Sequence, residues 1–253
     1  MWFRFWNPAT RTISEKLGSC RVDGQVHYSN LKFGYDSSTD IYKVVYFLPE
    51  TTNVRIFNMG DNVWRNIQNS PVAHHLYNMN VVHLSGSFNW LAIHNYNNDD
   101  YDCKDINNIE QFVIISLDLG TETHSQLLPP QGFQEVPFVI PNLSVLKDCL
   151  CFCHDFKQTH FVIWQMKEFR VEESWTQFLK ISYHNLQIDH DFNYFNIYLS
   201  TICLSEKNDT LLLTTNCESS AILYNWRDNS AKRIDKSWWF NVHDYVESLV
   251  TYC

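Results

Sequence analysis

The residues with the most obvious chemical potential are three alternating cysteines followed by a histidine, in the run CLCFCH at 149–154. Thiolates and imidazoles bind zinc, but zinc sites usually contain cysteine pairs separated by about two to four residues. Here every second residue is a cysteine, so on a β-strand all three thiols would point to one face. Cysteine is also among the residue types most often buried. We therefore predict that Cys149, Cys151 and Cys153 are small core side chains and that the run holds no metal.

The other histidines do not form a recognisable catalytic or metal-binding motif. They include His74, His75, His184 and the triplet Asp189-His190-Asp191, which we interpret as part of a solvated loop. The sequence contains no H-E-x-x-H motif, no nucleophile elbow and no glycine-rich phosphate loop. With only 7 glycines in the chain, phosphate-cradling loops are not expected. The sequence thus predicts a protein that is not an enzyme, with no catalytic residues, no metal and no cofactor.

An acidic, tyrosine-containing stretch, NYNNDDYDCKD at 95–105, is the most unusual segment of the chain. Acidic side chains speed the encounter with a basic partner, and tyrosines make good interface anchors. The candidate partner-binding residues are Tyr96, Asp99, Asp100 and Tyr101. Their order does not match the D-x-D-x-D-G pattern of a calcium loop. The alternative interpretation is a solvated loop between two hairpins.

Two other segments could also contact a partner. The first is the proline-containing linker 131–141, whose candidate contact residues are Phe133 and Phe138. The second is the run WWF at 238–240 near the C-terminus. In an intact domain we expect this run to belong to the core, and in a truncated one it could be exposed.

Composition and charge exclude several classes of protein. The net charge is −9, with no basic stripe to follow a phosphate backbone, so no nucleic acid partner is expected. No apolar run approaches the roughly 20 residues of a membrane span, and the N-terminus does not resemble a signal peptide. The 8 cysteines have irregular spacings that match no disulfide framework. We therefore expect reduced thiols, a cytoplasmic or nuclear location and no membrane partner.

The candidate segments lie in a chain that repeats one pattern of alternating apolar residues, a polar corner and a second apolar run. The repeats centre on Trp6, Phe57, Leu117, Trp164 and Tyr224, at spacings of 51, 60, 47 and 60 residues. Between them lie further segments that read as strand, turn and strand, at 78–94, 141–155 and 197–215. We interpret 168–178 as an extended turn. One unit is therefore two hairpins, and its length is that of a kelch-type propeller blade.

These repeats predict a single all-β domain over 1–253, a kelch-like β-propeller. A lone blade buries only part of its apolar surface, whereas stacked blades bury both faces. We expect an incomplete ring of about four full blades plus one composite blade from the chain ends, 1–6 and 242–250. The side chains expected to fill the space between blades are Trp64, Trp90, Trp164, Trp175 and Trp226.

The amino-acid sequences of the repeats resemble those of a known family. The segments are FWNPATR at 5–11, FGYDSSTDIYKVV at 33–45, VRIFNMGDNVWRNI at 54–67, LSGSFNWLA at 84–92, ISLDLGTE at 115–122, LSVLKDCLCF at 143–152, FVIWQMKEFRVEESWTQ at 161–177 and DYVESLV at 244–250. In this order they resemble the F-box-associated domain of the plant F-box/kelch-repeat family, over nearly the whole chain. In that family an N-terminal F-box binds the Skp adaptor of a cullin-type ubiquitin ligase, and the repeat domain holds the target protein.

The resemblance implies a protein-binding module that recognises substrates for ubiquitination. Its expected partners are a target protein of unknown identity and a Skp-type adaptor, the latter only where an F-box lies upstream, because no F-box is visible ahead of Asn7-Pro8. One alternative is a truncated remnant of such a receptor without function. Another is a propeller enzyme or carbohydrate-binding propeller, which the scarcity of carboxylates in expected inner strands such as VVHLSG and LSVLKD disfavours.

Overall fold

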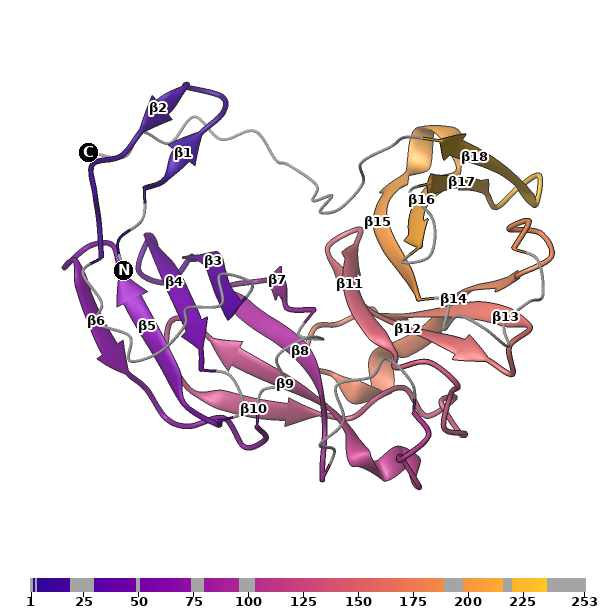
Figure 1. Ribbon diagram of the computed structural model, residues 1–253, viewed down its shortest axis with the longest axis horizontal. Coiled ribbons are helices and arrows are strands. Elements are labelled where there is room, and N and C mark those ends of the chain that lie inside the picture. Colours follow the sequence, from indigo (N-terminus) through magenta and orange to yellow (C-terminus); the bar gives the residue numbers. More distant parts are fainter. Residues whose placement is uncertain are drawn as a thin grey trace.

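The computed structural model describes residues 2, 4–18, 30–48, 51–73, 80–95, 103–188, 198–215 and 220–235. Within these ranges the regular structure is almost entirely antiparallel β-sheet, and the helical segments are short 3-10 turns such as Ile109–Gln111 and Glu172–Ser174 (Figure 1). No helix in the described ranges has the length and apolar character needed to cross a bilayer. The predicted all-β class is confirmed.

Four sheets of four strands follow the N-terminal hairpin, and in each sheet neighbouring strands are consecutive in the chain. The hairpin pairs β1 (Trp6–Asn7) with β2 (Thr12–Ile13). Blade 1 contains β3 (Leu31–Asp36), β4 (Ile41–Phe47), β5 (Val54–Asn58) and β6 (Val63–Asn66). Blade 2 contains β7 (Val82–Leu84), β8 (Ser87–Ile93), β9 (Phe112–Asp118) and β10 (His124–Leu127). Blade 3 contains β11 (Asn142–Leu146), β12 (Cys149–Phe156), β13 (His160–Met166) and β14 (Trp175–Ser182). Blade 4 contains β15 (Leu199–Ser205), β16 (Thr210–Thr215), β17 (Ser220–Asn225) and β18 (Ser230–Asp235).

Tight turns set the register of the hairpins, as the sequence predicts. Ser85 and Gly86 have φ of 48° and 71°, and Lys147 and Asp148 have φ of 54° and 53°. Positive φ at both central residues is the geometry of type I′ turns, whose twist matches that of the flanking strands. The turn expected within 197–215 is also present, as a 3-10 turn (Glu206–Asn208) followed by Asp209 with φ 50°. Asp, Lys and Ser thus take turn positions that glycine often occupies.

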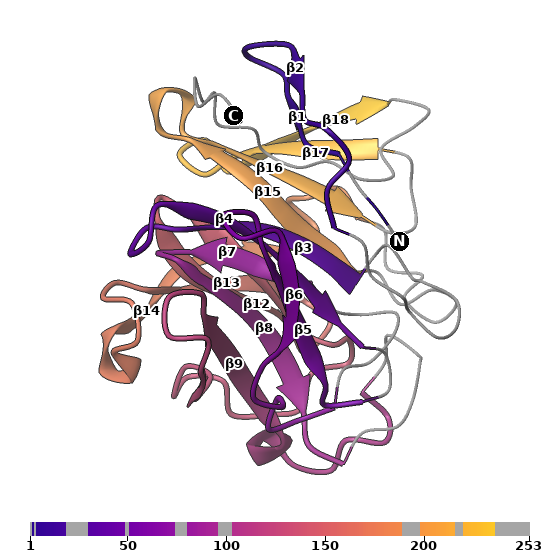
Figure 2. The same ribbon diagram turned by 90° about the vertical axis from the view of Figure 1, so that its left-hand side faces the viewer.

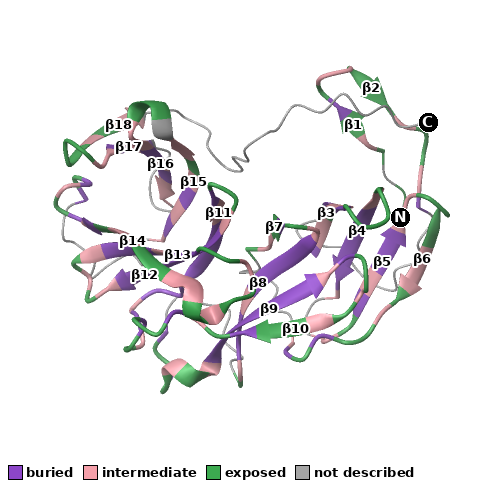
Figure 3. Cartoon of the chain, turned by 180° about the vertical axis from the view of Figure 1, so that it is seen from behind, coloured by how far each residue is buried: buried purple, intermediate pink, exposed green. Residues whose placement is uncertain are grey.

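Apolar side chains fill the space between successive blades. Along β9, Val113, Ile115 and Leu117 pack into the core shared with blade 1. The alternate residues Phe112 and Ile114 of the same strand pack into the core shared with blade 3. Because successive side chains of a strand point to opposite faces, one strand supplies two cores. Blade 2 is therefore buried on both sides, as the purple strands show (Figure 3).

The sheets are arranged as propeller blades around an axis. The first strands, β7, β11 and β15, lie side by side near the axis, and the fourth strands lie outside (Figure 1). The outer strands β10 and β14 are correspondingly more exposed than the strands inside them (Figure 3). This confirms the β-propeller fold. The proposed C-terminal strand at 242–250 and the WWF run at 238–240 lie outside the described residues.

Four of the five predicted tryptophans lie at or beside the blade interfaces. Trp90 is 1% exposed and packs edge-on against Phe47 of blade 1 at 5.0 Å between ring centroids. Trp164 and Trp175 pack against the core between blades 2 and 3, and Trp226 packs against the core between blades 3 and 4. Trp64 is half-buried against Phe57 of its own sheet. The predicted extended turn at 168–178 is confirmed for 168–174, which form bends and a 3-10 turn, but it is wrong for 175–178, which already belong to β14.

The antiparallel order places the connections on two opposite faces of the propeller. One, here the turn face, carries the links between first and second strands and between third and fourth strands of each blade. The other, here the loop face, carries the links between second and third strands and between blades. Figure 2 shows the blades from the side, with connections leaving at both faces. The described residues of the two predicted contact segments, 95, 103–105 and 131–141, belong to connections on the loop face.

Gly34 on β3 tests whether blades 1 and 2 are closely packed. A Cβ at this position would lie 2.7 Å from the Phe88 ring and 3.0 Å from Leu119, both in blade 2. Overpacking of this kind costs about 1–3 kcal/mol. We expect Gly34→Ala to lower the free energy of unfolding by that amount in urea titrations. Gly60→Ala is the control, because its nearest neighbours belong to its own blade. Equal losses in the two variants would contradict close packing between the blades.

Candidate functional site

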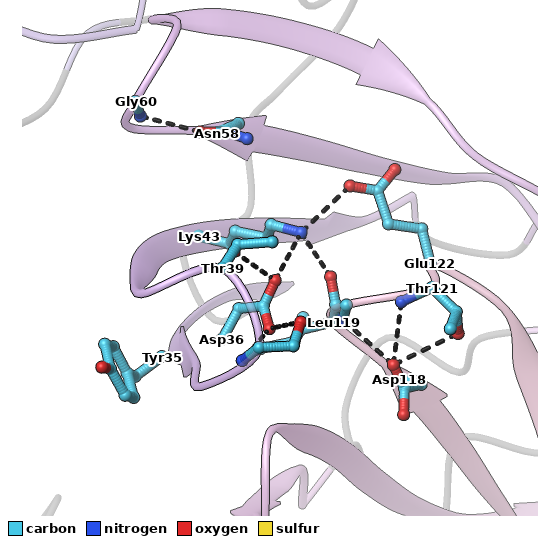
Figure 4. Close-up of polar contacts among 12 residues, drawn as sticks. Tyr35, Asp36, Thr39, Lys43, Asn58, Gly60, Asp118, Leu119, Thr121 and Glu122 are labelled. Carbon is cyan, nitrogen blue, oxygen red and sulfur yellow. Dashed lines mark hydrogen bonds and ion pairs between the residues drawn. The ribbon is translucent and has the colours of Figure 1, made fainter.

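A buried cluster of charged side chains lies on the turn face between blades 1 and 2 (Figure 4). Lys43 Nζ lies 3.0 Å from Asp36 Oδ2 and 3.2 Å from Glu122 Oε1, and it also donates to the carbonyl oxygen of Leu119. Lys43 and Asp36 are each 2% exposed. Asp36 and Lys43 come from the first hairpin of blade 1, whereas Leu119 and Glu122 come from the β9–β10 turn of blade 2. The lysine therefore bridges two blades.

Every charged group of this cluster is held by protein partners. Asp36 accepts hydrogen bonds from the Ser38 and Thr39 hydroxyls at 2.7 and 2.6 Å. Glu122 accepts from Arg65 Nε at 3.0 Å. The hydrogen bonds to Asp36 lower the pKa of that carboxyl despite its burial, and Arg65 and then Lys43 lower the pKa of Glu122. Fixed ionised groups of this kind stabilise an interface and are not poised for proton transfer.

A similar ionic contact joins blades 2 and 3. Arg170, in the β13–β14 turn, donates to Ser87 Oγ at 3.0 Å and to Asp118 Oδ2 at 3.1 Å, both in blade 2. Neither bridge is predicted from the sequence. The sequence feature that could have revealed the first bridge is Lys43, a charged residue inside the apolar strand IYKVVYF.

The loop face carries a cleft of about 380 Å³ between blades 2 and 3. Its volume falls in the range of about 300–1,000 Å³ that is usual for ligand pockets. Its lining residues are Cys103, Lys104, Glu135, Val136, Pro137, Phe138, Asp155, Lys157 and Gln158. The cleft thus brings together the end of one predicted contact segment, the middle of the other and the β12–β13 turn. An apolar wall with a few charged groups suits a peptide segment.

Asp155 holds the parts of the cleft together. Its carboxylate accepts hydrogen bonds from the Tyr183 hydroxyl at 2.8 Å and from the Gln158 backbone N–H at 3.1 Å. The backbone N–H of Phe138 is a third donor. Burial raises the pKa of Asp155 and outweighs the effect of these donors. The carboxylate is therefore a structural anchor that faces protein donors.

The two phenylalanines of the linker have different environments. Phe133 is 3% exposed, and its ring meets Phe152 at 5.0 Å and Phe112 at 5.4 Å between centroids. Its predicted contact with a partner is wrong, because the ring fills the core between blades 2 and 3. Phe138 is half-buried in the wall of the cleft, and its carbonyl oxygen accepts the Cys103 N–H at 3.3 Å. A contact between Phe138 and a partner stays a prediction.

Two of the three alternating cysteines are core groups, as the alternation predicts, whereas Cys149 is half-buried, and the adjoining His154 is buried too. Cys151 and Cys153 are fully buried on the face of β12 towards blade 4. Burial raises the pKa of both thiols, that of Cys153 to about 12, so neither is a thiolate at neutral pH. Burial lowers the pKa of His154 to about 4, and its Nε2 accepts from Trp164 Nε1 at 3.3 Å. In the described part of the chain no three histidine, cysteine or acidic residues could hold a metal ion.

The other predicted contact residues, Tyr96, Asp99, Asp100 and Tyr101, lie outside the described residues. The neighbouring positions 103 and 104 reach the cleft. Sequence reasoning missed Asp155, Lys157 and Gln158. Asp155 ends a recognisable strand, but its bond to Tyr183 joins positions that only the folded chain brings together.

Comparisons with known proteins agree with this architecture. A family model described as the F-box associated beta propeller domain matches residues 3–252. An F-box/kelch-repeat protein of Arabidopsis thaliana is 27% identical over 190 residues, covering 70% of this chain and 46% of its own length. The F-box protein CPR1 of the same plant is 25% identical over 203 residues, covering 68% of this chain and 46% of its own. The chain therefore spans about half the length of these curated relatives.

Among solved structures, the WD40 domain of SCAP from fission yeast is similar at a TM-score of 0.34 and 10% identity. The match covers 92% of this chain and 46% of that one.

Removal of the buried lysine should destabilise the propeller strongly. Lys43→Met leaves Asp36 buried without its ion-pair partner, and a loss of this kind costs about 3–5 kcal/mol. Both carboxyls of the cluster have a lowered folded pKa, so their stabilisation is present above the unfolded value of about 4 and is lost as the pH falls. Urea unfolding should show a difference from wild type that is largest at neutral pH and narrows in acid. Lys232→Met, at an exposed position, is the control. A difference that does not change with pH would contradict the ionic bridge.

Tyr183→Phe tests the anchor of the cleft. The variant removes one donor from a buried carboxylate, which costs about 1–3 kcal/mol. It should lower the free energy of unfolding and speed hydrogen exchange at the Phe138 amide, which donates to the same carboxylate. Tyr35→Phe is the matched control, because the Tyr35 hydroxyl contacts an acidic residue at an exposed site. Unchanged exchange at Phe138 in the Tyr183 variant would show that Asp155 does not organise the cleft.

Proposed function

This chain belongs to the family of F-box-associated β-propeller domains, and on that premise we propose that it holds target proteins on its loop face. The observation that carries the proposal is the cleft between blades 2 and 3. There three loop-face segments meet around an apolar wall that the buried Asp155 anchors. Propeller scaffolds fix the positions of their loops, so loop shape can select a partner without a change in the core.

We propose further that the protein acts as the substrate-recognition part of a cullin-type ubiquitin ligase. Two relatives with the word F-box in their names support this, and each is about twice as long as the stretch that matches. In the complete protein an F-box region would bind a Skp-type adaptor, and the propeller would present the target for ubiquitination. A location in the cytoplasm or nucleus fits this role. The net charge of −9 fits a protein whose partners are neither nucleic acid nor membrane.

Binding without catalysis is the proposed mode of action. The described groups that resemble catalytic machinery are engaged in structure: Lys43 in an ionic bridge, Cys153 and His154 in the core. The runner-up is a receptor remnant that binds no target. It differs from the proposal in one measurable outcome, which is target recovery that depends on the cleft.

The experiment is affinity purification from plant tissue with the full-length protein, comparing wild type with Phe138→Ala. We expect the adaptor to be recovered with both, and the target proteins to be depleted severalfold with the variant, because Phe138 lines the cleft. Phe33→Ala is the matched control, since Phe33 is 44% exposed on blade 1, away from the cleft. Targets that bind wild type and Phe138→Ala equally would contradict the proposed site. Loss of the adaptor from wild type would contradict the ligase role.

A further inference from the structure

Two lysines, of which Lys157 lines the cleft, contact a single aromatic ring beside it. Lys157 in the β12–β13 turn has its Nζ 5.3 Å from the centroid of Phe156, and Lys180 on β14 has its Nζ 4.0 Å from the same centroid. Both side chains are exposed. The face of an aromatic ring attracts ammonium groups, so the Phe156 ring favours both amines at this place.

Few carboxylates of the described structure neutralise this pair. Lys157 Nζ approaches Glu135 Oε1 at 3.7 Å, and the two side chains are 61% and 48% exposed. An exposed contact of this length contributes little and is easily exchanged. Lys180 has no ion-pair partner in the described part of the chain. An unpaired lysine beside a loosely paired one is notable in a chain with a net charge of −9.

Asp155, a buried acid in the lining of the cleft, is already engaged by protein donors. Its oxygens accept the Tyr183 hydroxyl and the Gln158 N–H. The lining of the cleft therefore combines the amine of Lys157 with the apolar side chains of Val136, Pro137 and Phe138, and Lys180 lies beside the cleft on the Phe156 ring. A ligand that uses both kinds of group must carry negative charge next to an apolar group.

We propose that the cleft binds an extended segment of a target protein in which an aspartate or glutamate adjoins an apolar residue. The carboxylate pairs with Lys157 in place of Glu135, and Lys180 adds positive charge beside the cleft. The apolar side chain packs against Val136 and Phe138. This inference rests on the proposed function and adds the chemical class of the segment that the receptor recognises.

The test uses the purified chain and a phage-displayed library of short random peptides. We expect enriched sequences to pair an acidic residue with a neighbouring apolar or aromatic one. The affinity of a synthetic copy of an enriched peptide, measured by fluorescence anisotropy, should fall about tenfold in the Lys157→Glu/Lys180→Glu variant and should weaken with added salt. Lys207→Glu/Lys232→Glu is the charge-matched control on exposed positions of blade 4 and should bind as wild type does.

Three results would overturn the inference: enriched peptides without acidic residues, enriched peptides that bind the cleft variant as tightly as wild type, or no enrichment. Thermal unfolding of both double variants shows that each is folded. Target recovery with the full-length protein separates this inference from the proposed function. If Phe138→Ala loses targets that the double lysine variant keeps, the cleft binds targets but not through acidic segments. If both variants keep all targets, the proposed function itself fails.

Discussion

Every blade of this propeller depends on its neighbours for burial of apolar surface. In blade 2, Ile114 and Ile115 are adjacent on one strand, both have 0% exposure, and they lie in different cores. A single four-stranded sheet would leave one of these faces in water, at a cost of roughly 25 cal/mol for each Å² of apolar surface. The sheets therefore stabilise one another, and the connections of blades 2 and 3 add Ile106, Phe133 and Ile140 to the core that these blades share.

Polar bridges add specificity to this apolar stacking. Lys43 links blade 1 to the β9–β10 turn, and Arg170 links blade 3 to Ser87 and Asp118. Both bridges involve turns or strand ends of blade 2 on the turn face, opposite the cleft. Buried ion pairs contribute less net stability than their geometry suggests, because desolvation opposes them, but loss of one partner is costly. The Arg170 bridge crosses the same pair of blades as the cleft, on the opposite face.

The repeat and the turns can be predicted from the sequence, because both depend on residues close together in the chain. Alternation in CLCFCH places thiols on one face whatever the partner strand is, and Lys147-Asp148 needs only its own backbone to form a turn. The cleft is different. Phe133 and Phe138 look equivalent in the linker, and only the packing of Phe133 against Phe152 buries one of them. Asp155 accepts a hydrogen bond from Tyr183, and Lys157 and Lys180 contact the same Phe156 ring. These contacts form only once β12, β13 and β14 have paired.

The central claim is that targets are held on the loop face between blades 2 and 3. Site-specific photo-crosslinking tests it most directly, with a crosslinking residue at Gln134, in the loop-face linker, or at Glu173, in the turn-face connection of blade 3; both positions are exposed. The account predicts covalent adducts with target proteins from Gln134 and none from Glu173. Adducts from Glu173 alone would contradict it and place recognition on the opposite face.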